Sequence, residues 1–179
     1  MRLLAHKLRG TEAAEIAEAA LVMPVVFIFL LGIIWFGRAF NIYSTITQAA
    51  QQGAIVAARP TCATCAAPGS SWGGTSFPGD TTVAGAVTSV MQASSLDPNQ
   101  IIATSLPGCP TSSNIQICRQ VLLNSTTGNA PQACTPGNPP QVCGTIVSFQ
   151  YPFQFYLPFT SLNLSRVVMN AQGQSRMEN

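Results

Sequence analysis

One stretch of the chain is continuously apolar. Residues 19–37 carry no charge, and a helix of that length spans about 28 Å, close to the thickness of a bilayer's hydrocarbon core. Arg2, Lys7 and Arg9 precede the stretch, whereas Arg38 is the one cation that closely follows it. Because excess Lys and Arg stay on the cytoplasmic side, we expect a single membrane span with its N-terminus inside.

The apolar pattern continues beyond the span at helical spacing. Small and aliphatic residues recur every three or four positions until Pro60, which bars further continuation. We therefore predict a largely continuous helix over residues 11–58, made of the span and a stalk whose small residues permit close packing. The recurring positions are Ile42, Ile46, Ala49, Ala50, Gly53, Ala54 and Ala57.

Shorter elements are predicted downstream. Asp80 is expected to cap a helix whose apolar face is formed by Val83, Val87, Val90 and Met91, and Asp97-Pro98-Asn99 predicts a turn. Apolar and alternating runs then predict strands over residues 101–104, 116–122, 145–151 and 162–169. A long helix followed by a further helix and a small antiparallel sheet gives an α+β fold.

Pro152 interrupts the most regular of these strand patterns. Apolar residues continue past it, at Phe153 and Phe155. Because proline has no N–H for the strand ladder, we expect the strand to end there, to bulge, or to lie at a sheet edge.

Composition narrows the classes of function. Charged residues make up 8% of the 179 residues and the net charge is +2, against about 25% charged residues in a typical soluble domain. The middle of the chain is rich in Ser, Thr, Asn, Gln, Gly and Pro, as expected of a neutral, exported surface. No basic stripe with interleaved aromatic residues is present, so no nucleic-acid partner is expected.

All six cysteines lie beyond the predicted span, at Cys62, Cys65, Cys109, Cys118, Cys134 and Cys143. An even number on the oxidising side of a membrane predicts disulfides. The pairing stays open, but two pairs share a nine-residue offset, Cys109 with Cys118 and Cys134 with Cys143, which makes local staples plausible. Cys62 with Cys65 would be the third.

Two other interpretations of the cysteines compete with disulfide staples. Cys62 and Cys65 have the spacing of a redox-active dithiol, although no βαβ pattern surrounds them. Zinc would usually require two Cys-x-x-Cys pairs or histidines, and His6, the one histidine, lies on the predicted cytoplasmic side. We expect no metal and no cofactor.

Hydrolytic catalysis would also be hard to build. The carboxylates beyond the span are Asp80, Asp97 and Glu178, apart from the chain end, and no lysine is found there. No glycine-rich phosphate loop follows a predicted strand. The sequence therefore predicts a protein that is not an enzyme.

The basic leader ends at Gly10, and Glu15 stands five residues later. This arrangement resembles the class III signal peptides of type IV pilins, in which a membrane aspartyl peptidase cuts after Gly and leaves Glu at the fifth mature position. The resemblance implies cleavage before Thr11, whose new ammonium could pair with Glu15 of a neighbouring subunit. Glu18, six residues before Pro24, is the alternative glutamate. Both could instead be solvated carboxylates favoured by a helix N-terminus.

Taken together, residues 9–59 resemble the TadE-like pseudopilins of tight-adherence (Flp pilus) systems. The C-terminus, around Leu162-Asn163-Leu164, Ala171 and Ser175-Arg176-Met177-Glu178, looks like the closing strand of that family. The carrying residues near the N-terminus are Arg9-Gly10, Glu15 or Glu18, Ala20-Leu21-Val22-Met23-Pro24, Gly32-Ile33-Ile34-Trp35-Phe36-Gly37-Arg38-Ala39-Phe40 and Ala49-Ala50-Gln51-Gln52-Gly53-Ala54.

The resemblance implies a minor pilin or pilus-assembly factor of the bacterial inner membrane, with a prepilin peptidase, sister pseudopilins and the pilus-assembly machinery as partners. We expect a cytoplasmic leader over residues 1–10, a transmembrane and stalk helix over 11–58, and a periplasmic domain over 59–179. Two alternatives remain: a membrane-tethered thiol-exchange protein that uses Cys62 and Cys65, and an anchored envelope domain unrelated to pili.

Overall fold

The computed structural model divides the chain into two compact units, which meet in sequence between Phe40 and Asn41 and are described separately. The residues that the structure describes are 11–59, 77–104, 106, 109, 114–123, 131–134, 142–154 and 166–176.

The longest element is helix α2, Thr11–Ala58, which confirms the predicted helix over residues 11–58. Its commonest residues are Ala and Ile, and Pro24 lies inside it, near the start of the apolar stretch. In the first unit its bulky apolar side chains are exposed; Phe29, for example, is 69% exposed. Within the described residues, α2 is the one helix long and apolar enough to cross a membrane.

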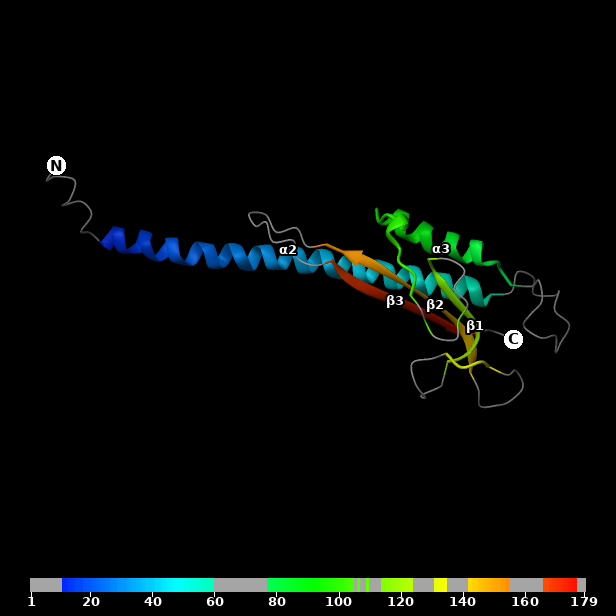
Figure 1. Ribbon diagram of the computed structural model, residues 1–179. Helices are drawn as coiled ribbons and strands as arrows, with labels where there is room; N and C mark the ends of the chain where they lie inside the picture. The colour runs from blue at the N-terminus through cyan, green and yellow to red at the C-terminus, as the bar shows by residue number, and fades with distance from the viewer. Residues whose placement is uncertain are drawn as a thin grey trace. The chain divides into compact units, whose positions relative to one another are not determined.

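The second unit combines helices with a three-stranded antiparallel sheet in the order β1-β2-β3 (Figure 1). The strands are β1 (Gln116–Leu122), β2 (Cys143–Phe153) and β3 (Val167–Arg176). Helix α3 (Asp80–Ala93) and the short 3-10 helix η2 (Pro98–Gln100) precede them. This architecture confirms the predicted α+β fold.

The main core lies between one face of the sheet and the helices. Val147, Phe149 and Tyr151, which alternate along β2, are buried together with residues of α2 and α3. Gly53 of α2 marks the contact, since a Cβ there would lie 2.6 Å from Cγ2 of Val87. The other members of this core are Ile46, Ala49, Ala50, Ala54, Ala57, Val83, Met91, Ile101, Ile115, Ile117 and Ala171.

Helix α3 begins where it was expected but not by the predicted capping. Its N-cap residue is Gly79, which has no side chain, and Asp80 is the first helical residue. The Asp80 carboxylate instead accepts a hydrogen bond from Arg119 in β1. The predicted turn at Asp97 is confirmed as the cap of η2, where Oδ1 of Asp97 accepts from the backbone N–H of Asn99 at 3.0 Å.

Two strand predictions need correction. Residues 101–104 form no strand; only Ile102 pairs, in an isolated bridge with Gln150. The last strand is β3, which starts at Val167 and runs to Arg176, whereas it was expected over residues 162–169. Residues 162–165 lie outside the described part of the chain. By contrast, β1 over Gln116–Leu122 confirms its prediction.

Pro152 lies inside β2 and does not end or bulge it. Its pairing with Val168 continues an unbroken register between β2 and β3. Gln150 exchanges both of its backbone hydrogen bonds with Ile102, so even-numbered residues of this part of β2 direct their N–H groups away from β3. At Pro152 that side has no pairing strand among the described residues, so the missing N–H costs no ladder bond. The interpretation as a local sheet edge was therefore the right one.

A bulge interrupts β1. Cys118 pairs with Ile146 and Val121 with Gly144, so β1 advances three residues where β2 advances two. Gln120 takes up the extra length with φ of 57°. The bulge returns Val121 to the same face as Cys118, and both are buried there with Ile146 in a smaller cluster away from the helices.

Candidate functional site

The candidate processing site lies at the start of α2. Thr11 is the first residue of the helix, and Gly10 falls outside the described residues. Glu15 and Glu18 are both helical and exposed, one turn apart. Their position at the N-terminal end of a long apolar helix suits either interpretation, so cleavage and the choice of glutamate stay predictions.

The end of the apolar run carries an aromatic residue and a cation in contact. The guanidinium carbon of Arg38 lies 5.9 Å from the centroid of the Trp35 ring, within range of a cation–π interaction. Aromatic and basic residues commonly mark the boundary between lipid tails and headgroups. The contact fits a membrane span that ends near Gly37.

Beyond Asn41 the same helix changes from exposed to packed. Ala49, Ala50 and Ala54 are fully buried, as the spacing of small residues predicted. Gly173 of β3 shows how close the packing is, because a Cβ there would lie 2.5 Å from the backbone nitrogen of Gln51 and closer still to the carbonyl of Ala50. The small residues of the stalk therefore bring the helix backbone against the sheet.

The two disulfides predicted from the nine-residue offset are present. Cys109 is bonded to Cys118 with their Cα atoms 5.3 Å apart, and Cys134 to Cys143 with theirs 5.7 Å apart. Cys62 and Cys65, the third predicted pair, lie outside the described residues. Among the residues that the structure describes, no cysteine is free and no cluster of three potential metal ligands occurs.

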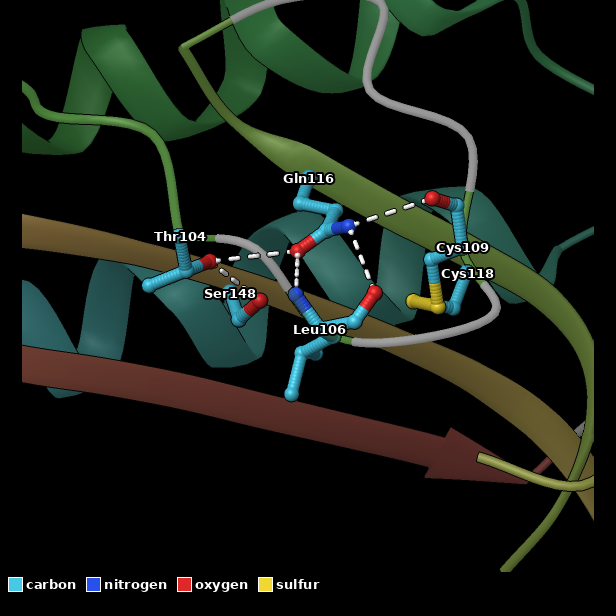
Figure 2. The surroundings of a disulfide bond; sticks show 6 residues. All are labelled: Thr104, Leu106, Cys109, Gln116, Cys118 and Ser148. Carbon is cyan, nitrogen blue, oxygen red and sulfur yellow. Dashed lines mark hydrogen bonds between the residues drawn. A yellow bond between two sulfur atoms is a disulfide. The ribbon is translucent and has the colours of Figure 1, made fainter. Parts of the chain in front are cut away.

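The first disulfide belongs to a hydrogen-bonded cluster on the sheet face away from the helices (Figure 2). Gln116 is buried, and its Oε1 accepts from the backbone N–H of Leu106 at 2.7 Å and from the hydroxyl of Thr104 at 3.3 Å. Its Nε2 donates to the carbonyls of Leu106 at 3.2 Å and Cys109 at 3.4 Å. The Thr104 hydroxyl also lies 2.9 Å from that of Ser148. The Gln116 amide thus holds the disulfide-bearing segment against β1, and the Thr104 hydroxyl holds it against β2.

The second disulfide holds a segment along the outer edge of β1. The N–H of Leu122 donates to the carbonyl of Gln132 at 2.8 Å, and the N–H of Cys134 donates to the carbonyl of Gln120 at 2.8 Å. Because Cys134 is bonded to Cys143 at the start of β2, this short segment is covalently tied to the sheet whose edge it covers.

An ion pair joins the two layers of the domain. Arg119 in β1 pairs with Asp80 at the start of α3, and its Nη2 donates to the carbonyl of Pro78 at 2.8 Å. Sequence reasoning missed this contact and the Gln116 cluster. The only available signal was a charged or amide side chain inside a predicted strand.

These features define a class: an α+β protein with a single N-terminal candidate membrane span, a stalk of small residues and a disulfide-stapled sheet domain. A family model described as TadE-like protein matches residues 13–54, which confirms the resemblance over the span and the packed stalk. The match indicates a protein associated with tight-adherence (Flp) pilus systems. No curated protein and no solved structure matches the chain.

Proposed function

We propose that this protein is a structural pseudopilin, a minor pilin-like subunit or assembly factor of a tight-adherence pilus, without enzymatic activity. Helix α2 would anchor it in the bacterial inner membrane, with the N-terminus in the cytoplasm and the sheet domain in the periplasm. The observation that carries the proposal is the change in α2 from exposed bulky residues to buried small ones, within the segment that the family model matches.

The exposed part of α2 requires an apolar environment. Side chains such as Leu21, Ile28 and Phe36 are 64–74% exposed, and each such side chain gains roughly 1.5–3 kcal/mol on leaving water. A bilayer provides that environment, and so would sister helices in a filament. A subunit that moves from the membrane into a pilus must exchange contacts with lipid for contacts with sister helices. An apolar helix surface allows this exchange without exposure to water.

Processing supplies the second part of the proposal. Cleavage after Gly10 by a prepilin peptidase would create an ammonium at Thr11, and a carboxylate at a membrane boundary is costly unless paired. In an assembly the ammonium of one subunit would pair with Glu15, or with Glu18, of its neighbour and set the stagger between helices. Sister pseudopilins are the expected neighbours.

N-terminal sequencing of the protein recovered from membranes tests the processing. A start at Thr11 is expected, and the substitution Gly10→Val should leave Met1 in place. An intact Met1 in the wild-type protein would contradict the proposed cleavage.

The assembly role needs a separate test. Deletion of the gene should abolish surface filaments, and complementation should restore them. Glu15→Gln and Glu18→Gln, compared side by side, should differ, with the register glutamate failing to complement and the other succeeding. Normal filaments in the deletion strain would contradict the assembly role.

A further inference from the structure

The two edges of the sheet differ in the backbone hydrogen bonds that the described residues make to them. The edge of β1 is closed at Gln120 and Leu122 by the segment that the Cys134–Cys143 disulfide holds in place. On the other side, no described residue forms a backbone hydrogen bond to the outer edge of β3, Val167–Arg176. An uncovered edge is a template for pairing with another chain.

The backbone groups that β3 offers can be identified from the register. Gln150 bonds Ile102 through both its N–H and its carbonyl, so its pair with Asn170 across β2 and β3 is a non-hydrogen-bonded one. The register is unbroken, and alternation therefore directs the N–H and carbonyl groups of the even-numbered residues outward. These residues are Val168, Asn170, Gln172, Gln174 and Arg176, and all five side chains are exposed.

Strand β3 also lacks the features by which proteins usually protect an edge. Such edges are short, bulged, or marked by Lys or Pro. β3 has ten residues in continuous register with β2 and contains neither Lys nor Pro. Its one charged residue, Arg176, is the last. A segment held by a disulfide thus closes the edge of β1, whereas no described residue closes the longer edge of β3.

We propose that β3 is an interaction edge that takes an extended strand from a different polypeptide. The occupant is not a second copy of this chain. Antiparallel pairing of two β3 strands in full overlap would place Arg166 of each copy opposite Arg176 of the other, and like charges directly opposite each other destabilise a strand pair.

The parallel arrangements of two copies fail for other reasons. Two β3 strands related by a two-fold axis along their length would place the same groups at the same level, with N–H facing N–H. Pairing β3 with β1 of the next copy meets the edge that Gln132 and Cys134 already occupy. The strand that fits therefore belongs to another protein.

The exposed side chains of β3 indicate which residues the partner strand would carry. A ten-residue partner would extend about 30 Å at 3.3 Å per residue. On the exposed face it would meet Asn170, Gln172 and Gln174, which favours uncharged side chains that form hydrogen bonds. Arg166 and Arg176 are exposed at the two ends of β3, and neither forms an ion pair with a described residue. An acidic residue near each end of the partner strand would complement them.

Hydrogen exchange of the full-length protein in detergent provides the first test. The outward amides of Asn170, Gln172 and Gln174 should exchange at least tenfold faster than those of Ala171 and Gly173, which bond to β2. Protection of the outward amides in the isolated protein would show that the chain covers its own edge, and would overturn the proposal.

Photo-crosslinking in cells identifies the occupant. p-Benzoylphenylalanine is introduced in place of Gln172 or Gln174 in the full chain, with Gln92, exposed on α3, as the matched control position. Both β3 positions should give an adduct with the same second protein, mapped to one extended segment of it, and position 92 should not. An adduct with a second copy, or no adduct, would overturn the proposal.

An edge variant connects the adduct to backbone pairing. With the crosslinker at position 174, Gln172→Pro removes one outward N–H without breaking a bond to β2, and it should reduce the adduct at least fivefold. Gln172→Thr should leave the adduct unchanged. Asn170→Lys, which adds an edge charge and keeps the N–H, provides a second variant should Gln172→Pro fail to form its disulfides.

The readout is independent of filaments. Normal pili in the deletion strain, together with the heterologous adduct in the strain that carries the crosslinker, would refute the assembly role and keep the interaction edge. A piliation defect in the deletion strain without any adduct in the crosslinking strain would refute the interaction edge and keep the assembly role.

Discussion

The contact between Gly173 of β3 and the backbone of α2 gives the sharpest test of the packing. Replacing Gly173 with Ala places a Cβ 2.5 Å from the backbone nitrogen of Gln51 and nearer still to the carbonyl of Ala50. Real Cβ contacts do not reach such distances. The obstructing atoms belong to the helix backbone, so no side-chain rotation relieves the clash, and α2 or β3 must shift.

The magnitude follows from the nature of the obstruction. Inserting a methyl group into a packed core typically costs 1–3 kcal/mol, and the low end applies where a flexible side chain can move. Here the neighbours are main-chain atoms, so we expect Gly173→Ala to lower the free energy of unfolding by about 3 kcal/mol. That change reduces the folding equilibrium constant by roughly a hundredfold.

Gly85→Ala is the matched control. Gly85 lies in α3 with no heavy atom within 4 Å of the position that a Cβ would take. Alanine should therefore raise stability by about 0.4–1 kcal/mol through the helix preference and the unfolded-state entropy. Urea titration of the full-length, oxidised protein in mild detergent, read by pulse proteolysis, measures both variants. If Gly173→Ala stayed within about 0.5 kcal/mol of wild type, the close approach of α2 to β3 would be refuted.

Three further predictions concern the sheet domain. Replacing both Cys109 and Cys118 with Ser should cost about 2–3 kcal/mol of unfolding free energy, as expected for a short closed loop, measured by the same titration with wild type as control. Gln116→Leu should cost about 1–3 kcal/mol by leaving partly buried backbone groups of Leu106 and Cys109 without this partner, whereas Gln174→Leu, at an exposed position, should change stability by under about 0.5 kcal/mol. Burial raises the pKa of Tyr151 above 10.0, opposed by a hydrogen bond from the backbone of Asp97, so the neutral phenol is favoured in the folded state. Stability from this group should be fully present below pH 10 and be lost as pH rises above it, and equal losses between pH 9 and pH 11 in wild type and Tyr151→Phe would contradict that assignment.

The elements with a strong apolar period were predictable from the sequence. The C-terminal boundary of α2 followed from an uninterrupted helical spacing and from Pro60, and α3 from the spacing of its buried residues Val83, Val87 and Met91. The local disulfides followed from the shared offset of their cysteines. In each of these, interactions close in the sequence determine the structure.

The predicted position of β3 was wrong because most of the residues at its inward-facing positions are not strongly apolar. The residues that face the helices are Met169, Ala171, Gly173 and Ser175, and three of these four are small. They are small because the backbone of α2 lies so close to β3. This close approach is a feature of the tertiary structure and cannot be read from the sequence of β3 alone. A hydropathy pattern therefore favoured residues 162–169, which are richer in Leu and Val.

The polar contacts were unpredictable for a related reason. Asp80 has the sequence context of a helix cap, and only the fold brings Arg119 within reach of it. The ion pair is partly exposed, with 28% and 41% of the two side chains accessible, so it contributes at most about 1 kcal/mol. The ion pair lies beside the bulge at Gln120, and we infer that it fixes the position of α3 against β1 more than it adds stability.

The two faces of the sheet are stabilised by different means, and the reason is geometric. On one face, a long helix brings a continuous surface of small residues, and van der Waals contact with the sheet is sufficient. On the other face, the described contacts come from short pieces of chain at Thr104, Leu106 and Cys109, and the apolar cluster of described residues there is small. Segments of this length bury too little apolar area to offset their ordering entropy. The Cys109–Cys118 disulfide and the Gln116 amide provide the remaining stabilisation, so the outer face depends on an oxidising compartment and the helix face does not.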